Sequence, residues 1–387
     1  MNPKQNQMIK VGITGQSGFI GTHLYNTLGL YPERFQRIPF DDNYFNDHNS
    51  LTAFVKSCDA IVHLAAMNRH NDPQTIYQTN INLCQKLIDA CQATGAKPHI
   101  IFSSSTQEER DNLYGKSKRE GRLLFEQWAN RNHAAFSGFI IPNVFGPFGR
   151  PYYNSVVATF CHQLTHNEEP LIEVDGELKL IYVSELIEHF ITHISIVAQS
   201  RNWQTHVETV QIPHTATIKV STILAMLNEF KSNYFDNGIF PNLTDPFERN
   251  LFNTFVCYID HVKFFPRKLE LKTDGRGSFV ETVKLNSGGQ VSFSTTKPGI
   301  TRGNHFHTRK AERFAVIKGK AIIELRRIGT PKKLTFEIDG DSNPAVVDMP
   351  IWFTHNLTNV GSNDVYTIFW ISEHFDPNDT DTFFENV

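Results

Sequence analysis

The pattern of the chain changes at about residue 266, and this change most constrains the fold. Before it, short apolar runs alternate with stretches of helical period, as where Ile9–Thr14 is followed by Gly18–Leu28. After it, from Leu269 onward, strands rich in Val, Ile, Phe and Thr follow one another, with turn residues between them and no useful helical period. The sequence therefore predicts a doubly wound parallel α/β sheet over residues 8–265 and an all-β barrel or sandwich over residues 266–387.

The first region contains further elements of both kinds. Strands are predicted at 60–65, 99–103 and 136–141, and helices at 81–93 and 114–130. The segment from about residue 202 to residue 266 is mixed in pattern, and we interpret it as a substrate-side lobe with a linker. The order of strand, helix, strand and helix is typical of a Rossmann-type fold.

Length and charge narrow the class of ligand. A chain of 387 residues is long enough for two domains, and a formal charge of −3 gives no basic footprint for nucleic acid or an anionic membrane. No apolar run approaches the length of a transmembrane helix, and residues 1–10 lack the apolar core of a secretory signal. Five scattered cysteines without a CxxC pair favour reduced thiols. We therefore expect a cytoplasmic protein that acts on a small molecule. These features do not determine the oligomeric state, for which a homodimer is the working expectation.

A glycine-rich loop joins the first strand to the first helix. Gly15, Gly18 and Gly21 have the spacing GxxGxxG, with Phe19 and Ile20 between the last two. Glycines let a backbone approach a pyrophosphate, and the N-terminus of the helix offers free N–H groups. Leu64, Ala65 and Ala66 follow a later strand and supply side chains that would lie close to an adenosine. These residues predict an NAD(P) site.

The choice between NADP and NAD depends on the end of the second strand. Arg37 would pair with the 2′-phosphate of NADP, whereas Asp41 or Asp42 would accept a hydrogen bond from the 2′-hydroxyl of NAD. The two alternatives stay open at this point, and we take NADP, with Arg37 as its contact, as the working prediction.

A YxxxK motif supplies the predicted chemistry. Tyr114 and Lys118 lie one helical turn apart and so share a helix face. A neighbouring ammonium favours the phenolate and is expected to lower the pKa of Tyr114, which makes the tyrosine a proton donor or acceptor near neutral pH. The run Ser103–Ser105, at the end of the preceding strand, offers a hydroxyl to a substrate carbonyl.

Residues 8–200 resemble the extended short-chain dehydrogenase/reductases, the family of nucleotide-sugar epimerases and dehydratases. The resemblance implies that a Ser–Tyr–Lys trio acts on a sugar C4 carbonyl and that a nicotinamide cofactor carries the hydride. Ser105 is the best match to the family hydroxyl, and Ser104, close behind, is assigned to substrate binding. The loop between Ser105 and Tyr114 is shorter than in most of the family. The substrate-binding assignment also includes three asparagines: Asn80, Asn143 and Asn154.

Three histidines and a glutamate have metal-ligand spacing in the second region. His305 and His307 alternate on one predicted strand and so face the same side, and Glu312 and His355 can complete the set from neighbouring strands. This donor set suits Zn(II), Fe(II), Mn(II) or Ni(II). With the glycines at 299 and 319, the pattern resembles the two motifs of the cupin family, which implies a metal-binding barrel. Trp352 departs from it, since the second motif usually has glycine there.

Matching stretches run along the whole chain, at residues 15–21, 143–146, 154–160, 275–279, 297–307 and 375–378. On these, the fusion of the two regions resembles the CapF/WbjC type of capsule and O-antigen enzyme. The resemblance implies that the cupin epimerises C3 of UDP-2-acetamido-2,6-dideoxy-4-hexulose. The reductase domain would then reduce the C4 ketone with NADPH to UDP-2-acetamido-2,6-dideoxy-β-L-talose. It also implies a divalent metal, with Zn the first choice. Spacing does not identify the epimerase base, for which Tyr366, Asp348 and His374 are candidates.

Two other functions fit part of the pattern. A nucleotide-sugar 4-epimerase or 4,6-dehydratase that uses a cupin only for dimerisation would retain NAD⁺ tightly and show no net oxidation. A regulator that senses the cofactor with a reductase fold would be expected to lack the catalytic tyrosine. The presence of Tyr114 with Lys118 argues against the regulator.

Overall fold

The computed structural model describes residues 8–199 and 206–387. Residues 1–7, where no secretory signal was expected, and residues 200–205, where the mixed region begins, lie outside the described residues. Within the described part, the chain divides into two compact units. The first holds the residues up to Phe145 together with Tyr153–Ser155 and Glu177–Ile218, and the second holds the rest. None of the described helices is long and apolar enough to cross a membrane.

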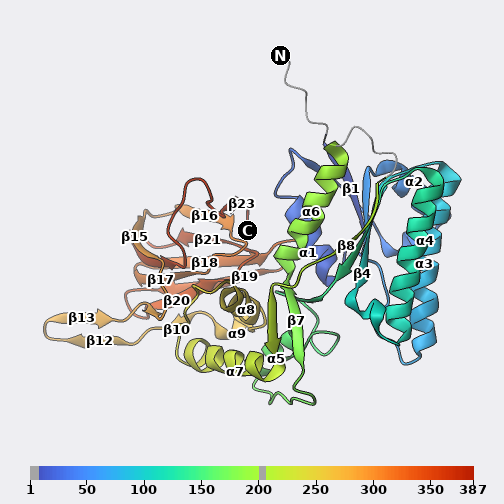
Figure 1. Ribbon diagram of the computed structural model, residues 1–387. Helices are drawn as coiled ribbons and strands as arrows, with labels where there is room; N and C mark the ends of the chain where they lie inside the picture. Colours follow the sequence, from blue (N-terminus) through green and yellow to red (C-terminus); the bar gives the residue numbers. More distant parts are fainter. Residues whose placement is uncertain (1–7, 200–205) are drawn as a thin grey trace. The chain divides into compact units, whose positions relative to one another are not determined.

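The first unit is built on a six-stranded parallel sheet, as the alternating pattern predicts (Figure 1). Its strands, in spatial order, are β2 (Phe35–Ile38), β1 (Ile9–Thr14), β3 (Ala60–His63), β4 (His99–Ser105), β5 (Phe136–Ile141) and β8 (Val207–Gln211). Helices α1 (Phe19–Leu28) and α6 (Val183–Gln199) cover one face. Helices α2 (His48–Ser57), α3 (Pro73–Thr94) and α4 (Leu113–Asn132) cover the other. The doubly wound fold is confirmed.

Smaller elements connect these layers. The turns η1 (Asp42–Asn46) and η2 (Thr106–Glu109) follow β2 and β4. A second, three-stranded sheet consists of β6 (Asn143–Phe145), β7 (Glu177–Tyr182) and β9 (Ala216–Lys219). Local capping determines where the main helices begin. The Asp47 carboxylate accepts from the N–H groups of the first turn of α2, and Asp72 does the same for α3. Each such cap stabilises its helix by about 1 kcal/mol.

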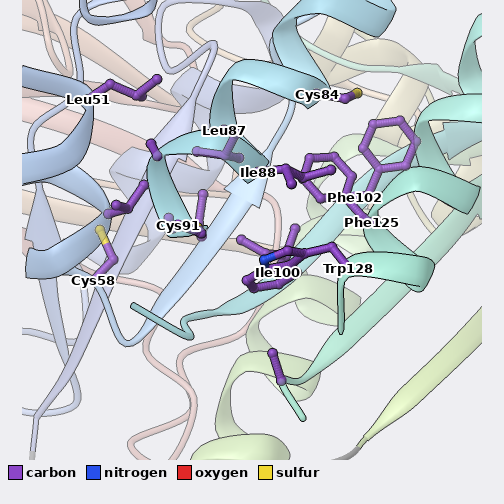
Figure 2. Close-up of a cluster of buried hydrophobic side chains, with 14 of the residues drawn as sticks. Leu51, Cys58, Cys84, Leu87, Ile88, Cys91, Ile100, Phe102, Phe125 and Trp128 are labelled. Carbon is purple, nitrogen blue, oxygen red and sulfur yellow. The ribbon is translucent and has the colours of Figure 1, made fainter. Parts of the chain in front are cut away.

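An apolar core fills the space between the sheet and the layer of α2, α3 and α4 (Figure 2). Leu87 and Ile88 on α3, Phe125 and Trp128 on α4 and Phe102 of β4 are buried members of this core, in which the centres of the Phe102 and Phe125 rings lie 5.5 Å apart. This core holds β4 and α4 in register, and these two elements carry the serines and the YxxxK motif.

The second unit contains two five-stranded sheets. One has the order β11 (Arg267–Lys268), β20 (Ala345–Met349), β17 (Glu312–Lys318), β22 (Val365–Ile371) and β15 (Gln290–Thr296). The other has the order β19 (Lys333–Asp339), β18 (Lys320–Arg327), β21 (Phe353–Asn359), β16 (Thr301–Phe306) and β23 (Phe383–Phe384). Residues from both sheets, among them Val316, Ile323, Leu357 and Val365, form one buried core. This antiparallel packing of two sheets is consistent with a cupin barrel.

The remaining elements of the second unit are short strands and helices. They are the hairpin β12 (Leu271–Asp274) and β13 (Gly277–Val280), the pair β10 (Ile239–Phe240) and β14 (Lys284–Leu285), and the helices α5 (Val156–Thr165), α7 (Val220–Phe230), η4 (Lys231–Asp236), α8 (Pro246–Val256) and α9 (His261–Phe264).

Residues 219–265 lie in the same compact unit as the barrel, although the sequence analysis grouped them with the cofactor-binding domain. The contacts give the physical reason. Arg313 of β17 forms a buried ion pair with Asp348 of β20, and Asp348 also accepts a hydrogen bond of 2.7 Å from the Tyr234 hydroxyl on η4. A buried ion pair needs further hydrogen bonds, and the segment of residues 219–265 supplies one of them through Tyr234. The predicted boundary of the reductase domain at residue 265 stays a prediction, because the compact units describe packing and not function.

Candidate cofactor site and metal centre

The glycine loop has the geometry that close approach of a pyrophosphate requires. Gly15 adopts φ +71°, and a Cβ on it would lie 2.8 Å from the backbone nitrogen of Ala65. A Cβ on Gly21 would lie 2.3 Å from the Gly15 carbonyl oxygen. Gly18 is the N-cap of α1 and gives the helix no side-chain cap, which leaves the N–H groups of Phe19, Ile20 and Gly21 for a ligand. These residues fit a dinucleotide.

The segment after β3 lies beside this loop. The Leu64 N–H donates to the Thr14 carbonyl at 3.1 Å, and the Thr14 hydroxyl lies 2.7 Å from Nδ1 of the buried His63. The structure therefore brings Leu64, Ala65 and Ala66 next to Gly15, as the adenosine site requires.

The three candidates for recognition of the adenosine ribose differ in how they are used. The exposed Arg37 places its guanidinium 4.3 Å from the centre of the Tyr25 ring and donates to the Tyr25 carbonyl. Asp41 accepts a hydrogen bond from the Asn43 N–H as the N-cap of η1. Asp42, in the first turn of η1, is exposed. The Asp41 carboxylate thus already accepts a hydrogen bond within η1. The Arg37 guanidinium is positioned near the end of β2 by its contact with the Tyr25 ring.

Tyr114 and Lys118 lie on α4 beside the end of β4. The Lys118 ammonium donates to the Ser103 carbonyl oxygen at 2.9 Å and lies 5.8 Å from the centre of the Tyr114 ring. Lys118 is 4% exposed. One hydrogen bond between the helix and the strand end therefore places the predicted proton donor and its lysine at the carboxyl edge of the sheet, where ligands of parallel α/β folds bind.

The net shift in the pKa of Tyr114 is opposite in direction to the lowering that the sequence predicted. Burial, with a smaller effect of Tyr153, raises the pKa of Tyr114 to about 12, and burial lowers the pKa of Lys118 to about 8. Desolvation disfavours the charged form of both groups, and it outweighs the attraction on which the sequence argument relied. Tyr114 is therefore a protonated phenol at neutral pH. Tyr153 has no sequence motif that marks it as a neighbour.

The three serines at the end of β4 have different partners. The Ser103 hydroxyl donates to the His63 carbonyl at 3.1 Å, and Ser104 donates to the Glu108 carboxylate. Ser105 accepts at 3.2 Å from the Gln107 N–H, which caps η2. Ser105 is also the most exposed of the three. Since its hydroxyl hydrogen has no partner among the described residues, Ser105 has a donor that could bind a substrate oxygen. Its catalytic role stays a prediction.

Glu108 was not predicted to matter, although it explains the short loop between Ser105 and Tyr114. Its carboxylate accepts from Arg122 of α4 at 2.9 Å as well as from Ser104. The pair ties the loop to the helix at a point one turn after Lys118. Only the i, i+4 spacing of Lys118 and Arg122 hinted that both side chains face the strand end.

The predicted substrate-binding asparagines divide into two groups. Asn80 is 4% exposed and bonds both the N–H and the carbonyl of Met67, as well as the Ser117 hydroxyl. Its amide therefore positions the segment after β3 instead of presenting a free group. Asn143 and Asn154 are exposed and lie in the first unit, where a substrate can reach them.

The four predicted metal ligands converge in the barrel. One ligand atom each from His305, His307, Glu312 and His355 lies within 4.8 Å of the other three. Ligands around a zinc ion lie about 2.0 to 2.2 Å from it, so atoms on opposite sides are up to about 4.4 Å apart. The strands β16, β17 and β21 supply His305, Glu312 and His355, and His307, predicted on the same strand as His305, follows the end of β16. Together they form a set of the size that a divalent cation needs.

Hydrogen bonds orient two of the imidazoles. His307 Nδ1 lies 2.6 Å from the Asp381 carbonyl oxygen, and His355 Nδ1 lies 3.2 Å from the Phe353 carbonyl oxygen. Because a carbonyl oxygen only accepts, both Nδ1 atoms carry the hydrogen and both Nε2 atoms face Glu312, at 3.3 and 3.2 Å. His355 Nε2 is buried with no hydrogen bond of good geometry. The Nε2 lone pairs of His307 and His355 thus converge on the Glu312 carboxylate, an arrangement that fits a bound cation.

The electrostatics of the cluster agree with this reading. Burial favours a neutral Glu312, but His307 and His355, which in their protonated forms donate from Nε2 and carry a positive charge, outweigh it and hold the pKa of the carboxyl well below its usual range. A cation between these atoms would take the place of those protons. Burial and the two other imidazoles lower the pKa of His305 to about 4. A carboxylate and a neutral imidazole are the protonation states that ligate metals.

Three further residues named from the sequence are placed by the structure. Asp348 is paired with Arg313 and is therefore not a free base. Tyr366 lies against Phe293 with the Lys318 ammonium over its ring. His374 is exposed. Trp352 adopts φ +63°, the left-handed region that explains why glycine is usual there, and its ring packs 5.7 Å from that of Phe306. It removes no ligand.

Comparisons with known proteins match both regions of the chain. Residues 11–202 match the NAD dependent epimerase/dehydratase family, and residues 272–383 match the polysaccharide biosynthesis C-terminal domain. The chain is 32% identical over 378 residues to the UDP-2-acetamido-2,6-beta-L-arabino-hexul-4-ose reductase of Pseudomonas aeruginosa, which covers 97% of this chain and 98% of that relative. The chain belongs to this reductase family.

Solved structures give the same assignment. The capsular polysaccharide assembling protein CapF of Staphylococcus aureus is similar with a TM-score of 0.60 and 32% identity, over 98% of this chain and 100% of that one. The RMD protein of Pseudomonas aeruginosa, solved with NADPH, shares the fold with a TM-score of 0.51 and 18% identity, over 58% of this chain and 83% of that one. This chain is therefore an oxidoreductase of polysaccharide biosynthesis, and its family implies an NAD(P) cofactor and a nucleotide-sugar substrate.

Proposed function

We propose that this enzyme carries out two consecutive steps on UDP-2-acetamido-2,6-dideoxy-4-hexulose. The barrel epimerises C3, and the first unit then reduces the C4 ketone to give UDP-2-acetamido-2,6-dideoxy-β-L-talose for capsule or O-antigen synthesis. The observation that carries this proposal is the presence of two separate constellations in one chain, the Tyr114–Lys118 pair and the cluster of three histidines with Glu312. The full-length relation to a hexul-4-ose reductase supports it.

The residues of the first unit account for the reduction. A bound NADPH supplies the hydride to C4. The Tyr114 hydroxyl donates its proton to the C4 oxygen, which completes the alcohol, and its raised pKa keeps that proton in place until the oxygen becomes basic. Ser105 donates a hydrogen bond to the same oxygen. Lys118, fixed on the Ser103 carbonyl, stabilises the phenolate that remains.

The barrel residues account for the epimerisation. His305, His307, Glu312 and His355 would hold the cation, for which Zn is our first choice. A bound divalent cation supplies a Lewis acid for the C4 ketone. The ketone acidifies the C3–H bond, so that a base of the barrel takes the C3 proton as an enolate forms, and an acid on the opposite face then returns a proton to C3. The Phe314 ring, 5.7 Å from the His355 ring, gives the site an apolar wall in which such charge stabilisation is stronger.

NADPH is proposed over NADH because of Arg37, whose exposed guanidinium is held at the end of β2. The homodimer and the cytoplasmic location expected from the sequence stay predictions.

One experiment tests the proposal. The purified enzyme is incubated with the UDP-4-keto sugar and NADPH in D₂O, and the product is analysed by NMR. We expect oxidation of NADPH, deuterium at C3 and an axial C4 hydroxyl of the talose configuration. A C4-epimerised or dehydrated product without net oxidation would favour the epimerase or dehydratase alternative. A mixture that neither consumes NADPH nor exchanges C3 hydrogen would refute the proposal.

A further inference from the structure

The C-terminal tail lies along β16, the strand that carries the candidate metal ligand His305 and ends one residue before His307. Strand β23 pairs antiparallel with β16, so that Phe384 lies opposite His305 and Phe383 lies opposite Phe306. The Glu385 N–H then donates to the Asn304 carbonyl at 3.0 Å. The tail thereby covers what would otherwise be the open edge of the sheet.

Asp381, just before β23, contacts a ligand directly through its backbone. Its carbonyl oxygen accepts from His307 Nδ1 at 2.6 Å. This bond fixes the tautomer of His307 and directs Nε2 toward Glu312, 3.3 Å away. Such outer contacts raise the basicity of a ligand and hold its ring in place.

The side chain of Asp381 holds the loop between two ligands. One carboxylate oxygen accepts from the Thr308 N–H at 3.0 Å and from the Thr308 hydroxyl at 2.6 Å. The other accepts from the N–H groups of Arg309 and Lys310 at 3.0 and 3.1 Å. These bonds cover the turn that leads from His307 to Glu312, so one residue sets the position of both ends.

The backbone of Asp381 shows that this arrangement is imposed by its contacts. The residue adopts φ +43°, a left-handed conformation that is unfavourable for a non-glycine residue, and it is 6% exposed. A surface turn would not need a buried carboxylate with four donors. The bonds to the ligand loop and to His307 are the contacts that stabilise it.

We propose that Asp381 is a positioning residue of the metal centre and that the C-terminal tail is part of that centre. This inference rests on the metal-binding part of the proposed function. Asp381 does not ligate the cation. It acts through His307 and through the loop of residues 308–310, and its loss is expected to weaken metal binding while the four ligands remain.

The test compares Asp381→Ala with Asp379→Ala in the full-length enzyme. Asp379 is the matched control, since it lies two residues earlier and carries the same charge, but it pairs with the Arg309 guanidinium at the surface and not with the loop backbone. Co²⁺ is titrated into protein freed of metal, and the visible spectrum and the dissociation constant are recorded. Unfolding of the metal-free protein is measured alongside.

We expect Asp381→Ala to weaken Co²⁺ binding by about 10- to 100-fold and to change the spectrum, with Asp379→Ala near wild type. An Asp381→Ala protein with wild-type affinity and spectrum would overturn the inference and leave the metal centre intact, even if its stability fell. A wild type that binds no Co²⁺ would overturn both. If Asp381→Ala is not recovered folded, Asp381→Asn replaces it, because one of its two amide atoms still accepts. An unchanged Co²⁺ affinity of Asp381→Asn would equally reject the role.

Discussion

The two units of this enzyme assemble their chemistry in different ways. In the first, the key groups are close in sequence. Tyr114 and Lys118 are one helical turn apart, and the glycine loop is a single turn between β1 and α1. In the second, three candidate ligands come from three strands and His307 from the residue after β16, with His305 paired across the sheet to His355 fifty residues later. The first site depends on local helix geometry, and the second depends on strand register.

This difference predicts how each site responds to change. A site made by one helix and one strand end loses a single chemical step when a side chain is removed. A site made by register and by a tail loses its ligand geometry when a supporting contact is removed. Substitutions that separate the two steps, or that fail to do so, therefore test the comparison.

Tyr114→Phe is expected to have the largest effect. Loss of the phenolic proton donor should lower the rate of NADPH oxidation by about 10²- to 10⁴-fold, the range of general acid catalysis. Deuterium exchange at sugar C3 should continue, because the barrel residues are unchanged. The measurements are absorbance at 340 nm and NMR in D₂O. Loss of both activities would show that the two steps share one site, and a wild-type rate of reduction would remove Tyr114 from the mechanism.

The double variant His305→Ala with His307→Ala should give the opposite pattern. Two lost ligands should empty the metal site and lower C3 exchange by about 10²-fold or more, since Lewis-acid stabilisation contributes several kcal/mol. Elemental analysis and NMR measure these effects. Mixing this variant with Tyr114→Phe should restore NADPH oxidation, because each protein keeps the step that the other lacks. A mixture that stays inactive would mean that the intermediate does not pass between molecules or that the steps are not separable.

The features that the sequence predicted are mainly the local ones, as in the first unit. The parallel sheet, the glycine loop and the YxxxK helix are local patterns, and strands β1 and β5 match their predicted bounds at residues 9–14 and 136–141. The His–X–His pair was visible because alternate strand residues share a face. Its convergence with Glu312 and His355 rested on the resemblance to cupins.

The features that the sequence did not reveal depend on distant contacts. Asp381 lies in a tail without a motif, and its partner His307 is 74 residues away. Residues 219–265 pack in the barrel unit because Tyr234 bonds Asp348, which no periodicity indicates. The pKa of Tyr114 was predicted in the wrong direction because burial, which spacing does not show, dominates.

Lys118→Met tests whether the buried ammonium, which the proposed reduction needs, lowers the free energy of unfolding of the protein. Below pH 8 the folded protein holds a buried ammonium whose pKa is about 8, against 10.5 for an exposed lysine. At about 1.4 kcal/mol per pKa unit, its removal should stabilise the protein by about 1 to 3 kcal/mol at pH 7. Between pH 8 and 10.5 the unfolded chain binds more protons than the folded one, so the stability of the wild type rises with pH and the advantage of the variant disappears.

Denaturant unfolding of Lys118→Met at pH 7 and pH 10 measures this effect, with Lys116→Met as the control. Lys116 is exposed on the same helix and should change stability by less than about 0.5 kcal/mol. The Lys118 variant should also reduce ketones slowly. A destabilised Lys118→Met at pH 7 would show that the hydrogen bond to Ser103 outweighs the cost of the buried charge.

The smallest expected effect concerns cofactor choice. Arg37→Ala should raise the KM for NADPH by about tenfold, because the loss of one exposed contact with the 2′-phosphate corresponds to about 1.4 kcal/mol. The KM for NADH should not change, since NADH has no such phosphate. Arg34→Ala is the control, since Arg34 is also exposed and stacks on Tyr31 and Phe35, but at the start of β2. Equal changes for both cofactors would place Arg37 in the structure of the unit alone and leave recognition of the ribose to Asp41 or Asp42.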